Sequence, residues 1–113
     1  MSDWIDDYFT AWNGTDSDAV VSYFTEDVEI EDVTAGHLSH GRDAAKKFFE
    51  VCLERVPGAQ YEVVEKRTLG DAYWVEWIMH VNDVHVRGAS VGTLRDGKIA
   101  VNHDYWNGAL FKV

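Results

Sequence analysis

The sequence feature that most constrains the fold is a hairpin signal in the last third of the chain, at Asp96-Gly97. This dipeptide lies between Leu94 and Ile99, and its residue types tolerate the positive φ angles that a two-residue type I′ turn needs. We therefore expect one strand over 84–95 and a return strand over 98–106. Alternation along the return strand then predicts one face with Ala100, Asn102, Asp104 and Trp106, and an opposite face with Ile99, Val101, His103 and Tyr105.

Asp104 is the unusual residue of the return strand, because a carboxylate here stands among aromatic neighbours in mid-strand. Either that face of the sheet is exposed to solvent, or Asp104 lines a cavity in which its charge has a function. The first case leaves an ordinary surface residue, and the second predicts a functional site.

Helical spacing of apolar residues precedes the strands. It predicts helices over 3–13, 16–24 and 42–56, the first capped by Ser2. A short strand is expected over 28–33, a loop over 34–41, and further strands over 61–69, 73–81 and 84–95. Helices followed by an antiparallel sheet predict an α+β fold, with the helices on one face of the sheet. The length of 113 residues predicts a single domain spanning 1–113.

Composition excludes several classes of partner. The net charge of −10 argues against nucleic acid, whose phosphates need a basic surface, and against anionic membranes. One cysteine, Cys52, permits no internal disulfide, and no signal peptide or membrane-spanning run is visible. No cofactor fingerprint, phosphate loop or metal-ligand spacing is present, including at His37 and His40. We expect a cytoplasmic protein without cofactor or metal.

One face of the strand over 73–81 also predicts an interface. Trp74, Ile78 and Val101 are expected on the side of the sheet that points away from the helices. A large exposed apolar patch usually marks a contact surface. We therefore expect a homodimer that forms through this outer face of the sheet.

The chain resembles the NTF2-like superfamily, and within it the small SnoaL-like and ketosteroid-isomerase-like proteins. The resemblance is carried by Tyr8–Gly14, Tyr23–Asp32, Gly41-Arg42, Asp96–Ile99 and Asp104–Trp106. It implies a cone-shaped fold, in which a curved sheet wraps around three helices and encloses an apolar pocket. It also implies that dimers are common, and that family members range from isomerases, cyclases, dehydratases and epoxide hydrolases to proteins without catalysis.

The resemblance implies roles for three residues. Asp32 falls at the place of the isomerases' general base, Tyr8 at that of their oxyanion-hole tyrosine, and Asp104 at that of a catalytic acid on the last strand of the cyclases and epoxide hydrolases. A carboxylate that faces an apolar cavity becomes a better base near neutral pH, because desolvation disfavours its anion. The alternatives are a surface carboxylate at Asp32 and a core aromatic residue at Tyr8.

Two departures from the family patterns limit the activity. The isomerases' second oxyanion donor falls near Val91, which has no proton to donate, and the Arg and Asp of the epoxide hydrolases fall near Trp77 and Met79. His85 and Arg87 are expected on the inward face with Val91, where either could pair with Asp104 or with a substrate oxygen. The alternatives are a structural ion pair and a solvated strand end. The expected pocket wall and substrate contacts are Trp12, Phe49, Trp77, Met79, His85, Arg87, Val91 and Trp106.

Three functions fit these residues. The first is a cofactor-independent acid/base enzyme acting on a small apolar oxygenated ring compound, by isomerisation, cyclisation or dehydration. The second is a non-catalytic ligand-binding or assembly protein of the same fold. The third is a dimer whose pocket is filled by its own aromatic side chains.

Overall fold

The computed structural model describes residues 3–111, with side chains described as far as Ala109. The elements are α1 (Trp4–Trp12), α2 (Ser17–Val21), β1 (Phe24–Asp32), β2 (His37–His40), α3 (Arg42–Arg55), β3 (Gln60–Leu69), β4 (Ala72–Val81), β5 (Val84–Arg95), β6 (Lys98–Trp106) and a 3₁₀ turn (Gly108–Phe111).

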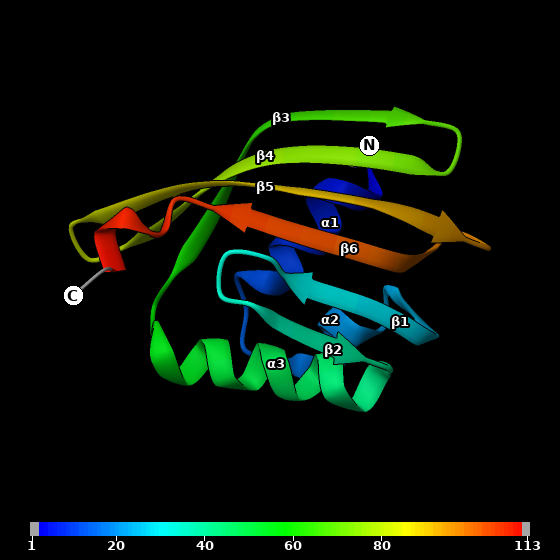
Figure 1. Cartoon of the computed structure of the whole chain (residues 1–113), viewed down its shortest axis with the longest axis horizontal. Helices are drawn as coiled ribbons and strands as arrows, with labels where there is room; N and C mark the ends of the chain where they lie inside the picture. The colour runs from blue at the N-terminus through cyan, green and yellow to red at the C-terminus, as the bar shows by residue number, and fades with distance from the viewer. Residues whose placement is uncertain (1–2, 112–113) are drawn as a thin grey trace.

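The six strands form one curved, unclosed sheet in the order β2-β1-β6-β5-β4-β3. Within the described part of the chain, β1 and β6 run parallel and the other neighbouring strands run antiparallel. Helices α1 and α2 lie behind the strands in Figure 1, and α3 runs alongside the β2 edge of the sheet. The buried side chains of the helices and of the inner sheet face form one core. The predicted α+β fold is therefore confirmed.

Three boundaries differ from the sequence-based prediction. The second helix ends at Val21 and not at residue 24, because Phe24 already belongs to the first strand. The first strand begins at Phe24 instead of Val28, because the Phe24 side chain packs into the core and its backbone pairs with Ile99. The predicted loop after β1 contains β2, which pairs with the last four residues of β1. That pairing gives hydrogen-bond partners to backbone N–H and C=O groups of β1, which would otherwise be unpaired at the edge of the sheet. The third helix accordingly follows two strands.

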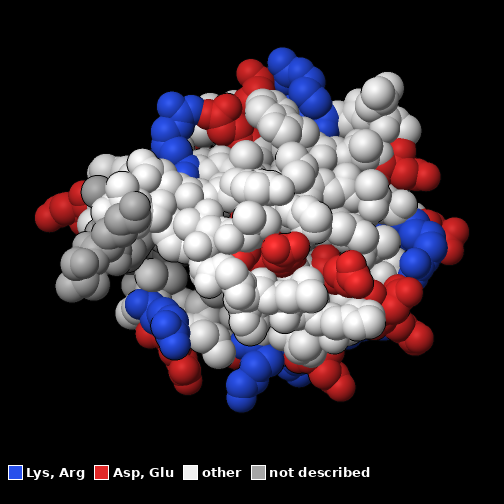
Figure 2. Space-filling model, in the orientation of Figure 1, with Lys and Arg blue, Asp and Glu red and all other residues white. Residues whose placement is uncertain are grey.

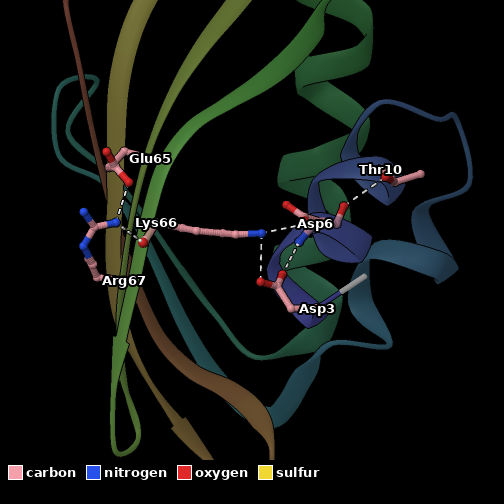
Figure 3. A network of polar contacts seen from close by, with 6 residues as sticks. All are labelled: Asp3, Asp6, Thr10, Glu65, Lys66 and Arg67. Carbon is pink, nitrogen blue, oxygen red and sulfur yellow. Dashed lines mark hydrogen bonds and ion pairs between the residues drawn. The ribbon is translucent and has the colours of Figure 1, made fainter. Parts of the chain in front are cut away.

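Lys66 of β3 ties α1 to the sheet. Its ammonium group lies 2.8 Å from a carboxylate oxygen of Asp3 and 2.6 Å from one of Asp6 (Figure 3). Asp3 also caps the helix, because its side chain accepts a hydrogen bond from the backbone N–H of Asp6. The predicted cap Ser2 lies outside the described residues. Together these contacts fix the face of α1 that carries Tyr8 and Trp12 against the sheet.

The hairpin between β5 and β6 has the predicted two-residue turn, with φ of 53° at Asp96 and 78° at Gly97. The pairing register shifts just beyond it, because Leu94 pairs with Ile99 whereas Thr93 pairs with Val101. Ala100 is thus the extra residue of a β-bulge. As a result, Lys98 and Ile99 point to the opposite faces of the sheet from those that simple alternation predicts. Ile99 points into the core and is fully buried, so its predicted place on the outer face is wrong.

The outer face of the sheet carries apolar side chains that no part of the described chain covers. Figure 2 shows mostly uncharged residues across this face, with acidic groups near its centre and Lys and Arg mostly at its rim. A shallow groove of about 320 Å³ lies there, and its lining includes Trp74, Ala89 and Tyr105. Tyr105 is 46% exposed, which is high for an aromatic residue in mid-sheet.

We propose that a second copy of the chain covers this face. Light scattering at micromolar concentration should then give twice the chain mass of 12.8 kDa. Tyr105→Glu should yield a folded monomer, because it places a charge in the apolar interface, whereas Leu69→Glu at the β3–β4 turn should stay dimeric. A monomeric wild-type protein would refute the proposal.

Candidate functional site

Asp32 and Asp104 lie side by side on the inner face of the sheet. They are direct partners in the parallel pairing of β1 with β6, and both side chains are partly buried. Neighbouring strands are about 4.8 Å apart, so the two carboxyl groups occupy one small region. Their placement on one face agrees with the sequence-based expectation. His37 of β2 is the next residue in this row, and its ring stacks on Phe48 of α3 at 5.5 Å.

Two hydrogen bonds reach the same oxygen of Asp104. Ser90 Oγ donates to Oδ1 at 2.6 Å, and Asn102 Nδ2 donates to Oδ1 at 2.8 Å. Burial raises the pKa of the Asp104 carboxyl to about 6, the two hydrogen bonds oppose that rise, and the charge of Asp32 adds to it. The effect of desolvation on the pKa is therefore larger than that of the two hydrogen bonds, and the carboxyl group stays protonated up to a pH of about 6.

A second layer of aromatic residues holds these two donors. Trp77 Nε1 donates to Ser90 Oγ at 2.9 Å, and the Tyr73 hydroxyl donates to Asn102 Oδ1 at 2.5 Å. Both rings come from β4 and lie across the inner face of β5. The chains Trp77–Ser90–Asp104 and Tyr73–Asn102–Asp104 therefore converge on one carboxylate oxygen.

Glycines in β5 make room for the two rings. Gly88 is paired with Trp77, and a Cβ at Gly88 would lie 2.4 Å from the indole ring. Gly92 is paired with Tyr73, and a Cβ there would lie 2.0 Å from the carbonyl oxygen of Val101 and 2.6 Å from the Tyr73 hydroxyl. No larger residue fits either position without displacing a ring or the backbone.

Asp32 is also held through one oxygen. Trp106 Nε1 donates to its Oδ1 at 2.7 Å, and the backbone N–H of Ala35 donates to the same atom at 3.0 Å. Among the contacts of residues 3–111, the hydrogen bonds of both carboxyl groups end on Oδ1, and Oδ2 of each accepts none. Each group therefore keeps one oxygen for another partner.

Tyr8 enters the core from α1 and is 5% exposed. Burial raises the pKa of its phenol, and the nearby charge of Asp104 raises it further, so the hydroxyl stays protonated. The ring of Trp12, one helical turn later, packs edge-on against the Tyr8 ring with centroids 6.5 Å apart. Tyr8 lies within a cluster of aromatic rings that also includes Trp4, Phe9, Tyr23 and Phe24.

Aromatic rings fill most of the space in front of the carboxyl groups. Trp12 packs edge-on against Phe49 at 4.9 Å, and Tyr61 packs against Trp77 at 5.3 Å. A crevice of about 10 Å³ remains between α1, α3 and β3, lined by Trp12, Phe49, Cys52, Leu53, Val56, Ala59 and Tyr61. That is room for about one water molecule. A ring-sized ligand needs these side chains to move.

The sequence matches a family model described as a SnoaL-like domain over residues 5–102. The chain belongs to the SnoaL-like family. A search of curated proteins finds no match.

Solved structures agree with the SnoaL-like assignment. A putative polyketide cyclase from Sinorhizobium meliloti is 23% identical with a TM-score of 0.82, covering 93% of this chain and 95% of that chain. A hypothetical protein with a ketosteroid isomerase-like fold from Catenulispora acidiphila, in complex with trimethylamine, is 20% identical with a TM-score of 0.83, covering 89% and 82%. The epoxide hydrolase/cyclase-like enzyme SalBIII is 24% identical with a TM-score of 0.78, covering 91% and 87%.

Three residues predicted to face the pocket of this SnoaL-like chain lie on the outer face instead. His85 contacts His80, Arg87 forms an ion pair with Glu76, and Val91 pairs with Trp74 and His103. The inward expectation for His85, Arg87 and Val91 is therefore wrong. The inward residues of β5 are Val86, Gly88, Ser90 and Gly92. The small size of these inward residues misled the prediction, because a larger apolar residue such as Val91 is the more typical core residue.

Sequence reasoning missed Ser90, Asn102 and Tyr73, which form the polar support of Asp104. The signal for Ser90 was the alternation of Gly88, Ser90 and Gly92, in which three small residues share one strand face. Trp77, Met79 and Phe49 are buried as predicted, Trp12 packs at the crevice, and Trp106 holds Asp32. Their contacts with a substrate stay predictions.

Cys52 borders the crevice as a partly buried thiol. Burial, together with the charges of Asp32 and Asp104, raises its pKa to about 12, so the thiol is inert at neutral pH. Over residues 3–111, no group of three or more His, Cys, Asp or Glu side chains is placed to hold a metal ion. No helix among them is long and apolar enough to cross a membrane.

The support of Asp104 predicts the effect of Ser90→Ala. Removing a donor to the anion should raise the Asp104 pKa beyond about 6, by about 1 pH unit, because hydrogen bonds to charged groups contribute about 1.5–3 kcal/mol. Carboxyl ¹³C chemical shifts measured against pH would show it. Ser39→Ala is the matched control, since Ser39 is a buried serine on the same sheet face that contacts His37. An equal shift in both variants would contradict the assignment.

Proposed function

We propose that this SnoaL-like protein is a cofactor-independent acid/base catalyst acting on small apolar oxygenated ring compounds, as an isomerase, cyclase or dehydratase. The observation that carries the proposal is the neighbouring pair Asp32 and Asp104, each held through Oδ1 with Oδ2 left free. Two neighbouring carboxyl groups in different environments can have different pKa values, so that one is protonated while the other is ionised. A general acid needs the protonated form and a general base needs the ionised form.

The environments of the two groups suggest their roles. Asp104 keeps a proton to a pH near 6, so it is the group suited to donate. Asp32, at the end of β1, takes the proton from a carbon next to a carbonyl. The C–H electron pair then forms a carbon–carbon double bond, and the carbonyl oxygen receives the proton of Asp104. Tyr8 is the proposed hydrogen-bond donor to the same oxygen.

The fate of the resulting enol decides the reaction class. Return of a proton to a different carbon gives isomerisation, attack on a second carbonyl gives cyclisation, and loss of a neighbouring hydroxyl as water gives dehydration. None of these steps changes the oxidation state of the substrate overall. The apolar lining of the crevice favours a substrate that is mostly hydrocarbon. A cytoplasmic location is part of this proposal and rests on the sequence alone.

A specific observation also favours a second function, that of a non-catalytic ligand-binding or assembly protein. The rings of Trp12, Phe49 and Tyr61 close the interior to a crevice of about 10 Å³. A protein that binds without catalysis, or that uses only its outer face, needs no open site in front of Asp104.

Hydrogen–deuterium exchange distinguishes the two functions. In deuterated buffer, a panel of apolar cyclic ketones should lose α-hydrogens faster with the protein than without it, as followed by proton NMR. Asp32→Asn and Asp104→Asn should each slow this exchange by about 100-fold or more, since general acid/base groups contribute about 10²–10⁴ in rate.

His103→Gln is the control for that experiment, because His103 lies on the outer face beside Glu31. It should exchange at the wild-type rate. Ketones that bind and shift protein resonances without exchanging would support the non-catalytic function. Exchange that persists in both Asn variants would refute the assignment of the pair.

A further inference from the structure

Two histidines and a glutamate meet on the outer face of the sheet, away from the carboxyl pair. His80 of β4 is the direct cross-strand partner of His85 in β5, and Glu62 of β3 lies beside His80. The pair stands at the closed end of the β4–β5 hairpin, where Val81 pairs with Val84 across a two-residue turn. Asn82 takes the positive φ of 51° that this tight turn needs. The two imidazoles therefore project from a rigid base.

The contact with Glu62 selects one tautomer for neutral His80. Its Nε2 lies 2.8 Å from Glu62 Oε1, and an ionised carboxylate only accepts, so Nε2 carries the proton. The neutral ring then has its lone pair at Nδ1. That atom lies 2.8 Å from Nδ1 of His85. The two Nδ1 atoms therefore face each other across a short gap.

We propose that this pair is a binding site for a divalent transition-metal ion of the zinc class, with His80 Nδ1 and His85 Nδ1 as the protein ligands. The ion binds between the two Nδ1 atoms, and His85 holds its own proton on the outward Nε2. Neutral imidazole is a preferred ligand of such ions. This site is independent of the acid/base function proposed above.

The geometry is close to that of a metal-bound pair. Zinc–nitrogen bonds of about 2.0–2.1 Å at a tetrahedral angle place two ligand nitrogens about 3.3 Å apart. A small rotation of either exposed ring widens the present 2.8 Å separation to that value. Water fills the remaining positions, or the same pair of a second copy does if the outer face is shared.

Glu62 supplies the hydrogen-bond acceptor that normally stands behind a metal-ligating histidine. A carboxylate that accepts from the far N–H of a ligating imidazole fixes its orientation and makes it a stronger donor. The charges around the site do not oppose a cation. Arg87, two residues from His85 on the same face, is already paired with Glu76, and the whole chain has a net charge of −10.

Calorimetric titration of the full-length chain with Zn²⁺ tests the proposal. The wild-type protein should bind one ion per chain, or one per two chains if a dimer shares it. His80→Gln and His85→Gln should remove saturable binding, and Glu62→Gln should weaken it by about 10-fold or more. All three side chains lie on the outer face, and circular dichroism checks that the variants fold.

Two controls separate this site from other candidates. His103→Gln, another outer-face histidine beside a glutamate, should bind like the wild type. The double variant Asp32→Asn/Asp104→Asn should also keep binding, because the carboxyl pair lies on the other face. The proposal is overturned if the wild type does not bind by about 1 mM Zn²⁺, or if His80→Gln binds as tightly as the wild type.

Discussion

The organisation of the site depends on the burial of one carboxyl group, that of Asp104. Its anion loses hydration on the inner face of the sheet, and two hydrogen bonds from Ser90 and Asn102 offset part of that loss. Those donors are useful only because they are themselves held, by Trp77 and Tyr73. Residues of β4, β5 and β6 thus combine to orient a single oxygen and leave the other one free.

The composition of β5 makes this arrangement possible. Its inner face alternates Gly88, Ser90 and Gly92, so two large rings from β4 can lie over it and still reach polar partners. The same rings help to close the interior. The protein therefore combines a well-supported carboxyl group with a crevice of about 10 Å³, which is too small for a ring-sized ligand as it stands.

Much of the frame of the site could be predicted from the sequence, because the frame follows from periodicity and turn chemistry. The Asp96-Gly97 turn and the inner face of β4 have this origin, whereas the expectation that Asp32 and Asp104 share one site came from the family resemblance. The bulge at Ala100 could not be predicted, since one inserted residue leaves the local pattern intact while it reverses a face. The face of β5 was wrong because its inward residues are small. The hydrogen bonds to Asp104 depend on which rings lie over those small residues, and that is a property of packing in three dimensions.

The stability of Asp104→Asn relative to the wild type, measured against pH, tests the central claim most directly. Asparagine can still accept both hydrogen bonds but has no charge to bury. The folded wild type holds its proton up to a pKa of about 6, against 3.8 for the ordinary carboxyl, so this group's contribution to stability falls as pH rises through that window. Denaturant unfolding should show Asp104→Asn gaining up to about 3 kcal/mol on the wild type between pH 4 and pH 8. A difference that stays constant with pH, or that shifts toward the wild type, would contradict a buried, proton-holding Asp104.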